Sequence, residues 1–438
     1  MTIKMKDSGI KWIGMIPEGW NVLKLKSCYS FGKGLSITKA DLCEQGLGVI
    51  SYGQVHSKDN IEASVRESLI RYLPFDHVSL SDNSRVSIND LIFADTSEDL
   101  EGCGNCIFID SENVKYAGYH TIILHPKTKE TSRYFGYLFT TDAWKTQIRE
   151  NASGVKVYSI TQDMLKNAYL LAPPIATQHK VVSYLDAKCA EIDALIAAKE
   201  KSNALLKEYR QSIIFEAVTK GLDPNVPMKD SGIEWIGMIP EGWKLIPLQR
   251  ITNYNSQTLS EDTIDDFEFD YIDIGAVTYD KGIESFQRML FKDSPSRARR
   301  IVQEDDIIVS TVRTYLKACA QIPNHDTPII VSTGFLTLRA KNNIDNRFLK
   351  YAIISDSFVS EVEACSVGIS YPAINATDAI KMKIAVPPHC EQIRIADYLD
   401  AKCAEIDVLI EANEKTINQL KEYRQSVIFE AVTGKMEV

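Results

Sequence analysis

The sequence lacks the features of a membrane protein, of a disulfide-linked protein and of a strongly basic protein. It has no run of about 18 apolar residues, and its start, MTIKMKDSGIKW, lacks the apolar core of a signal peptide. Its nine cysteines are odd in number and scattered, which is not typical of a secreted disulfide framework. With 49 Lys and Arg against 59 Asp and Glu, the formal charge is −10. We therefore expect a cytoplasmic protein in which any contact with nucleic acid depends on local patches or on a partner.

Common catalytic motifs are also missing from the sequence. It contains no GxxxxGKS/T phosphate loop, no HExxH, no GxSxG and no GxGxxG after a predicted strand. The seven histidines are far apart, and none has metal-ligand spacing with another. CGNC, from Cys103 to Cys106, has the spacing of a metal or redox pair, but without a second pair the preferred interpretation is a turn containing Gly104 and Asn105. We therefore predict neither a catalytic centre nor a metal site.

Two Pro-Pro segments, APPI and VPPH, resemble the loop with which amino-methyltransferases grip a target base. The acid or amide that should precede the prolines is replaced by Ala172 and Val386. The simpler interpretation is a rigid, extended entrance to a helix, because a residue before proline avoids the helical conformation.

The most prominent feature of the sequence is an internal duplication. MKDSGIKWIGMIPEGW at residues 5–20 recurs at 228–243 with only Lys11 replaced, by Glu234. YLDAKCAEID at 184–193 recurs unchanged at 398–407, and EYRQSIIFEAVT at 208–219 recurs at 422–433 with one change. Each half therefore has an opening motif, a divergent segment and a shared C-terminal stretch. We predict a first domain at 1–174, a helix at 175–220, a linker at 221–227, a second domain at 228–388 and a second helix at 389–438.

Both shared stretches have the pattern of a long coiled-coil helix. Residues 178–219 contain no Pro or Gly, and apolar residues recur at spacings of three and four. A 42-residue helix is roughly 60 Å long. Neither helix can bury its apolar stripe alone, so we expect the two to pair as an antiparallel coiled coil. The predicted seam and partner residues are Leu185, Ile192, Leu195, Leu206, Tyr209 and Ile213 in the first copy, and Leu399, Ile406, Leu409, Leu420, Tyr423 and Val427 in the second.

The divergent segments have the pattern of mixed α+β domains. GVISYGQV, VSINDLIFADTS and YHTIILHP in the first, and FDYIDIGAV, EDDIIVSTV and PIIVSTGFLTLRA in the second, are typical of short strands. Helical stretches, RYFGYLFTTDAWKTQIRE and RFLKYAIISDSFVSEVEA, follow the last of these strands. The predicted fold class is α+β: two such domains in tandem, each followed by a long helix, with pseudo-twofold internal symmetry.

Several polar and basic positions in the divergent segments are candidates for contact with DNA. Arginine can neutralise phosphate and can bind guanine through two hydrogen bonds. The same residues could instead be ordinary solvated surface. The candidates are Lys33, Lys39, Tyr52, Gln54, Asn83, Arg85, Lys156 and Tyr158 in the first domain, and Arg297, Arg299, Arg300, Arg313, Tyr315, Lys317, Ser370 and Tyr371 in the second.

The order of these motifs resembles the specificity subunit of type I restriction-modification enzymes. The resemblance rests on SGIxWIGxIPEGW opening each half, on GISYPAIN at 368–375, on PPHCEQIRIADYLD at 387–400, and on the long helix that follows. The first half departs from the pattern in GVKVYSIT and in PPIATQHKVVSYLD. The resemblance covers nearly the whole chain.

This resemblance implies a DNA-recognition subunit with no catalytic centre. Each variable domain would read one half of a split target on double-stranded DNA, and the coiled coil would set the spacer and dock two methyltransferase subunits. S-adenosylmethionine, ATP and Mg would be bound by the partners, including restriction-motor subunits, and not by this chain. The alternatives are a self-contained DNA methyltransferase or endonuclease, and a coiled-coil scaffold that binds protein.

The opening motif is better explained as a packing and turn element than as an active site. Two nearly identical strings require identical surroundings, so we expect equivalent places in a pseudo-twofold framework. The residues concerned are Trp12, Ile13, Ile16, Pro17 and Trp20, repeated as Trp235, Ile236, Ile239, Pro240 and Trp243.

Overall fold

The computed structural model describes residues 4–60, 64–76, 80–128, 132–369 and 371–438. The chain divides into two compact units: Met1–Lys199 with Lys415–Val438, and Glu200–Glu414. Each unit therefore combines one α+β domain with part of both long helices. Among the described residues, no helix has the length and apolar character needed to cross a membrane.

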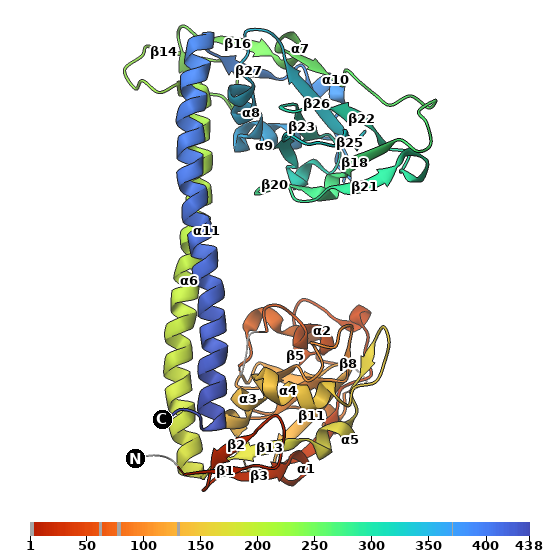
Figure 1. The fold of residues 1–438 in the computed structure, drawn as a ribbon, viewed down its shortest axis with the longest axis vertical. Helices are drawn as coiled ribbons and strands as arrows, with labels where there is room; N and C mark the ends of the chain where they lie inside the picture. Colours follow the sequence, from red (N-terminus) through yellow and green to blue (C-terminus); the bar gives the residue numbers. More distant parts are fainter. Residues whose placement is uncertain (1–3, 61–63, 77–79, 129–131, 370) are drawn as a thin grey trace. The chain divides into compact units, whose positions relative to one another are not determined.

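Domain 1, in the first unit, is built around a four-stranded and a three-stranded sheet, whose strands β11 and β5 are labelled in Figure 1. The larger is antiparallel, in the order β4 (Tyr29–Lys33), β11 (Thr121–Pro126), β7 (Leu91–Ala94), β9 (Cys106–Phe108). The smaller has the order β10 (Val114–Ala117), β5 (Leu47–Ile50), β6 (Arg71–Leu73), with β10 and β5 parallel. All four residues of β7 are buried, which explains its continuous apolar sequence LIFA.

Domain 2, in the second unit, repeats this arrangement. Its antiparallel sheet has the order β17 (Thr252–Tyr254), β26 (Phe335–Ala340), β23 (Ile307–Ser310), β24 (Cys319–Gln321). Its second sheet has the order β21 (Gln287–Leu290), β18 (Glu268–Ile272), β25 (Ile329–Ser332), β22 (Ala298–Val302), with β18 and β25 parallel. The order of strands matches that of domain 1 except for the added β22. The expectation of two α+β domains of similar topology is confirmed.

Local structure differs from the sequence predictions at two kinds of place. Each predicted helical stretch is two helices: α3 (Ser132–Thr140) with α4 (Asp142–Arg149), and α8 (Asn346–Ile354) with α9 (Asp356–Ala364). Thr141 and Ser355 interrupt them because each side chain accepts a hydrogen bond from the backbone of the following helix. In GVISYGQV the strand stops at Ile50, and the next residues form the short helix α2 (Tyr52–Val55).

The two long helices are α6 (Ile175–Lys220) and α11 (His389–Thr433). Each begins just after a Pro-Pro pair, and a buried glutamine fixes that junction. The side-chain amide of Gln178 donates to the carbonyl of Pro173 at 2.7 Å, and that of Gln392 donates to the carbonyl of Pro387 at 2.9 Å. These contacts support the interpretation of the prolines as a rigid helix entrance. Past the ends of the helices, Gly221 and Gly434 have φ near +70° to +80°, which favours glycine.

The opening motif is a packing element in both halves. It forms hairpins β1 (Met5–Asp7) with β2 (Met15–Pro17), and β14 (Met228–Asp230) with β15 (Met238–Pro240). Its buried side chains share an apolar cluster with the C-terminal end of a long helix. Ile13, Ile16 and Trp20 pack with Val427, Ile428, Ala431 and Val432 of α11; Ile236, Ile239 and Trp243 pack with Ile213, Ile214, Ala217 and Val218 of α6. Each copy thus packs on the helix of the other half.

Within each unit, a stretch of α6 lies beside a stretch of α11 (Figure 1). Six of the twelve residues predicted for the seam are buried: Leu185, Ile192, Ile213, Leu399, Ile406 and Val427. Four others are about half exposed: Leu195, Tyr209, Leu409 and Tyr423. A straight α-helix has 3.6 residues per turn, so positions chosen on a 3.5-residue repeat drift out of the buried face.

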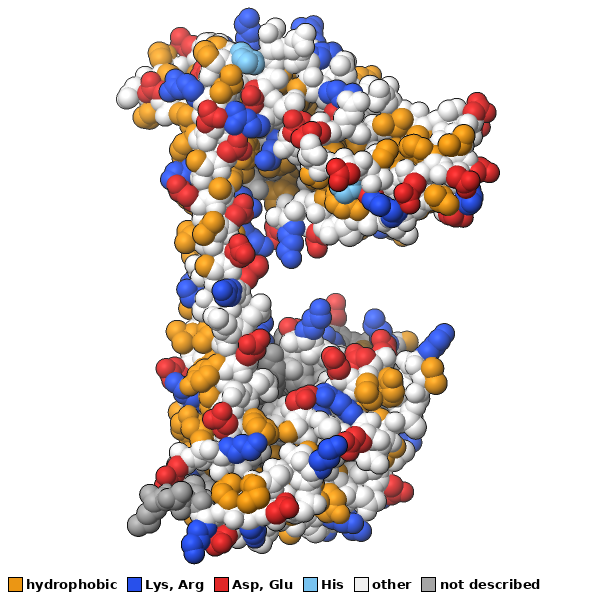
Figure 2. All heavy atoms as spheres, in the orientation of Figure 1, with side chains coloured by type: hydrophobic (Ala, Val, Ile, Leu, Met, Phe, Trp, Pro, Cys, Tyr) orange, Lys and Arg blue, Asp and Glu red, His pale blue; other side chains and the backbone are white. Residues whose placement is uncertain are grey.

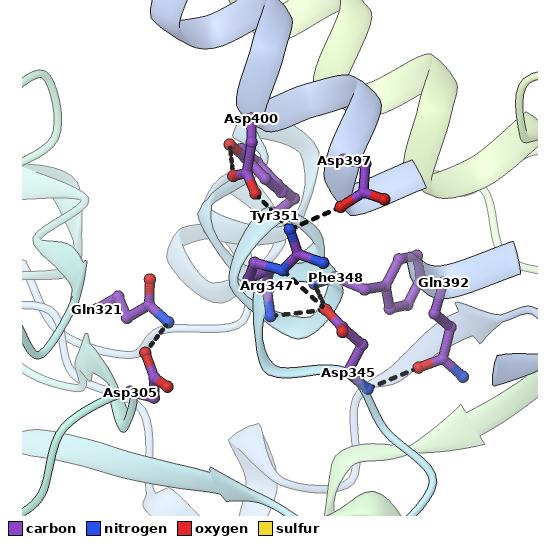
Figure 3. Close-up of polar contacts among 9 residues, drawn as sticks. All are labelled: Asp305, Gln321, Asp345, Arg347, Phe348, Tyr351, Gln392, Asp397 and Asp400. Atoms are coloured by element: carbon purple, nitrogen blue, oxygen red, sulfur yellow. Dashed lines mark hydrogen bonds and ion pairs between the residues drawn. The ribbon is translucent and has the colours of Figure 1, made fainter. Parts of the chain in front are cut away.

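A polar node fixes each α+β domain to the beginning of the helix that follows it. In the second unit, Arg347 of α8 donates to Asp397 at 2.8 Å and to Asp400 at 2.9 Å, and the Tyr351 hydroxyl donates to Asp400 at 2.7 Å (Figure 3). Burial, reinforced by this hydrogen bond, raises the pKa of Tyr351, so the phenol stays a neutral donor. In the first unit Asp186 accepts from Arg133 at 3.0 Å and from Tyr137 at 2.6 Å. The same three residue types recur 214 positions apart.

Candidate nucleic-acid interface

Among the candidate residues of domain 1, Tyr52 lies in an aromatic cluster at one end of the large sheet. Its ring centroid is 5.5 Å from those of Tyr119 and His120, both in the turn that precedes β11. His120 has φ of +53°, and its Nδ1 lies 3.2 Å from Oδ1 of Asp95. An imidazole, a carboxylate and two phenols together offer both donors and acceptors to a ligand. Sequence analysis found only Tyr52 of this group.

The segment that carries Lys156 and Tyr158 adjoins this cluster. Tyr158 lies in β12 (Tyr158–Ser159), which pairs with β8 (Thr96–Ser97), directly after Asp95. The amide of Asp95 donates to the carbonyl of His120 at 3.1 Å. Backbone contacts therefore connect Tyr158 to the aromatic cluster, and Lys156 is exposed beside them.

The remaining candidates of domain 1 have other local roles. Asn83 and Arg85 flank Ser84, whose hydroxyl donates to the carbonyl of Lys33 at 2.7 Å, so these positions form a separate group. The side-chain oxygen of Gln54 accepts the amide of Ser51 at 3.1 Å, which caps α2. Lys39 lies in the short 3-10 helix Lys39–Asp41.

In domain 2, Arg313 and Tyr371 come together although they are far apart in the sequence. The Arg313 guanidinium carbon lies 5.2 Å from the centroid of the Tyr371 ring. Arg313 has φ of +52°, and Tyr315, two residues later, is half exposed. Ser370 lies outside the described residues. The cation and the aromatic ring form a surface that could contact both phosphate and base.

Arg297, the residue before β22, is connected to Arg313 through the turn between β25 and β26. The carbonyl of Arg297 accepts from the amide of Thr333, in the turn between β25 and β26, at 2.8 Å. The next residue, Gly334, accepts the amide of Thr311 at 2.8 Å, two residues before Arg313. A continuous backbone network therefore connects Arg297 to Arg313. The turn is repeat-equivalent to Tyr119 and His120 of domain 1.

Most basic candidates of domain 2 already have a partner within the domain. Arg297 is 2.7 Å from Asp273, and Lys317 is 2.8 Å from Asp356. Arg299 lies over the ring of Phe291 at 4.8 Å. Burial lowers the pKa of Arg300. The domain therefore presents fixed, partly neutralised guanidinium groups, consistent with the net acidic composition.

An acidic node that sequence analysis did not identify lies in the second sheet of domain 2. The buried carboxylate of Asp270 in β18 accepts two hydrogen bonds from Arg288, at 3.0 and 2.9 Å. Its Oδ2 is also 2.6 Å from Nε2 of His325, whose ring stacks on Phe286. The Arg288 hydrogen bonds dominate and lower the pKa of Asp270 to about 2. The repeat could not indicate this node because its residues lie in the divergent segment.

Charge of either sign is interspersed over both units on the face in Figure 2. Cys103 and Cys106, of the CGNC segment, are buried free thiols. Among the residues that the structure describes, no group of three or more His, Cys, Asp or Glu side chains could hold a metal ion.

Comparison with known proteins gives a consistent result. The family model for the type I restriction modification DNA specificity domain matches residues 17–206 and 240–422. The putative type I restriction enzyme MjaX specificity subunit of Methanocaldococcus jannaschii is 24% identical over 97% of this chain and 96% of its own length. The StySPI specificity subunit of Salmonella potsdam is 20% identical, over 97% of this chain and 90% of its own.

A solved structure has the same fold. It comes from work on complex assembly and conformational transition of the type I R-M system, and it matches with a TM-score of 0.66 at 15% identity. The match covers 96% of this chain and 99% of that chain. Two family domains in tandem span most of the sequence, so this chain belongs to the type I restriction-modification DNA specificity family.

Proposed function

We propose that this DNA specificity subunit reads a bipartite target, with one half-site for each α+β domain. The observation that carries the proposal is that two domains of one topology place different chemistry around an equivalent turn, the one that precedes β11 in domain 1 and β26 in domain 2. Domain 1 has Tyr52, His120 and Asp95 there, whereas domain 2 has Arg297 and Arg313. Base contacts specify a sequence, so different side chains on one scaffold suit two different half-sites.

The long helices act as an antiparallel coiled coil that sets the spacer. The register of two ion pairs supports this part of the proposal: Asp193 of α6 pairs with Arg424 of α11, and Arg210 of α6 pairs with Asp407 of α11. Moving forward along α6 thus corresponds to moving backward along α11 by the same number of residues. At about 1.5 Å per residue, α6 is roughly 70 Å long.

Two methyltransferase subunits dock on the helices. Support comes from the repeat-equivalent pairs Leu195 with Leu409 and Tyr209 with Tyr423, all about half exposed on the helices. Half-exposed aromatic and leucine side chains, present in two equivalent sets, suit two copies of one partner. S-adenosylmethionine, ATP and Mg belong to methyltransferase and restriction-motor partners.

A domain exchange tests the proposed function. Methylome sequencing of cells that carry this chain and its partners identifies the target, and residues 21–158 are then replaced by the variable segment of a relative. We expect one half of the target to change and the other to stay the same. A change in both half-sites, or in neither, would contradict the assignment of one half-site to each domain. Inserting one helical turn into both long helices should alter the tolerated spacer.

Two measurements distinguish the alternatives. S-adenosylmethionine-dependent methylation by the purified chain alone would indicate a self-contained enzyme. Gel shifts on random-sequence duplexes, with and without a methyltransferase partner, test the protein-binding scaffold: no retardation in either case would favour the scaffold.

A further inference from the structure

Each domain carries a small projecting turn with strongly exposed apolar side chains. In domain 1 the turn is closed by the backbone pair Ser153 and Ser159, and in domain 2 by Val367 and Ala373. We name residues 153–159 tip 1, and the described residues 367–369 and 371–373 tip 2. Val155 on tip 1 is 93% exposed, and Ile369 on tip 2 is fully exposed. These two residues are repeat-equivalent, although the domains around them have diverged.

The bases of both tips are fixed by backbone hydrogen bonds. On tip 1, the Ser159 amide donates to Ser153 at 2.9 Å, and the next amide, of Ile160, donates to Asp95 at 2.8 Å. On tip 2, Val367 and Ala373 exchange hydrogen bonds at 2.9 and 3.0 Å. Ile374 then donates to Thr311 at 2.9 Å. Each tip is thus attached to the sheet end that holds the candidate DNA contacts.

Glycine is required at the same position of both tips. Gly154 has φ of +150° and Gly368 has φ of +121°. A Cβ on Gly154 would lie only 2.0 Å from the carbonyl oxygen of Val157. The tight turn that this glycine permits directs the following aliphatic residue into solvent, where it contributes no core packing.

Cationic groups accompany the apolar residues. Lys156 directly follows Val155, and Arg313 stacks on Tyr371, two residues after Ile369. Asp95, the acid at the base of tip 1, is paired with His120. An apolar residue on a rigid base beside a cation matches the chemistry of a base-pair step, which is an apolar stack flanked by phosphates.

We propose that Val155 and Ile369 are wedges that insert between stacked base pairs, one in each half-site. The proposal rests on the proposed function, because it requires that these domains bind duplex DNA. The wedges would add indirect readout of the DNA sequence. The free energy needed to unstack two base pairs depends on the base step, so each wedge selects a deformable step without forming hydrogen bonds to its bases. Lys156 and Arg313 hold the flanking phosphates.

The test uses the full chain with its methyltransferase partner, and its target as defined by methylome sequencing. Fluorescent base analogues are placed in turn at each position of both half-sites. We expect wild-type protein to raise the fluorescence at one step per half-site. Ile369→Ser should abolish the rise in the half-site of domain 2 and weaken binding about tenfold. A mismatch at that step, which removes the cost of unstacking, should restore the binding of this variant.

Two further variants make the result specific. Val155→Ser should abolish the fluorescence rise only in the half-site of domain 1. Ile264→Ser is the matched control, because Ile264 is a 71% exposed aliphatic residue elsewhere in domain 2, and it should change neither binding nor fluorescence.

Three outcomes would overturn the wedge while leaving the proposed function intact. The first is specific binding by the wild-type protein with no fluorescence rise at any position, and the second is unchanged DNA binding by Ile369→Ser. The third is loss of the methyltransferase subunit from Ile369→Ser, which would make tip 2 a contact with protein. If the wild-type complex binds no duplex specifically, the proposed function fails, and the wedge with it.

Discussion

Arg424 of α11 donates two hydrogen bonds to Asp193 of α6, Nε to Oδ1 at 2.9 Å and Nη2 to Oδ2 at 3.2 Å. Asp407 and Arg210 occupy the positions of the internal duplication that are equivalent to Asp193 and Arg424. Arg210 also donates a hydrogen bond to Asp407. An exchange of partners of this kind defines an isologous contact, in which the same surface is used twice. The duplicated halves therefore interact as two copies of one chain would.

Replacement of Arg424 by alanine should destabilise the first unit. Only 8% of the Arg424 side chain is exposed, so its two charge-assisted hydrogen bonds are shielded from water. We expect a loss of about 2 kcal/mol in the free energy of unfolding, measured by chemical denaturation. Lys421→Ala, a change at an exposed position of the same helix, is the control and should have almost no effect. An Asp193→Ala, Arg424→Ala cycle should give a coupling energy near 1 kcal/mol.

A chain of residues 1–220 alone should form a symmetric homodimer. In the full chain, Trp20 and its neighbours pack on Val427, Ile428 and Ala431 of α11. The end of α6 offers nearly the same side chains, Ile213, Ile214 and Ala217, so a second copy could replace α11. Light scattering after gel filtration measures the mass. A monomer that remains folded would contradict the isologous contact, and Trp20→Ala should weaken the dimer.

Asp400 should hold domain 2 on α11. It accepts from both Arg347 and Tyr351, whereas Asp397 accepts from Arg347 alone and is 61% exposed. Asp400→Ala should lower the free energy of unfolding by about 2 kcal/mol and accelerate hydrogen exchange in α8. The rate of hydrogen exchange in α3 of the other unit should stay the same. Asp397→Ala is the matched control and should cost less than about 1 kcal/mol. Equal effects of the two variants would contradict the assignment of Asp400 as the main anchor.

The sequence predicts the parts of the fold that depend on repetition and periodicity. The long helices, the apolar strands such as LIFA, and the packing of Ile13, Ile16 and Trp20 follow from patterns that local physical chemistry explains. The breaks at Thr141 and Ser355 were missed because a capping side chain is a single residue within an otherwise helical pattern.

The candidate site was only partly predictable, for a different reason. Arg313 and Tyr371 could each be selected by residue type, but their contact depends on a bridge between Val312 and Ala373, which are distant in sequence. Likewise, the Asp270 node joins three strand or loop positions that no local pattern connects. The exposure of Val155 and Ile369 could not be inferred either, since aliphatic residues are usually expected in the core.

Domain 2 should lose stability in acid because of Asp270. Its pKa is about 2 in the folded protein, mainly through Arg288, against about 3.9 in an unfolded chain. A carboxyl group with a lowered folded-state pKa contributes stability above the unfolded pKa, and that contribution is lost as pH falls from about 4 to 2. A lowering of the pKa by nearly two units corresponds to about 2 kcal/mol of stability. Asp270→Asn should remove it at neutral pH and flatten the acid dependence, measured by denaturation at several pH values. Asp262→Asn, at an exposed position of the same domain, should leave the pH profile unchanged. If both variants kept the wild-type acid dependence, other carboxylates would have to carry it.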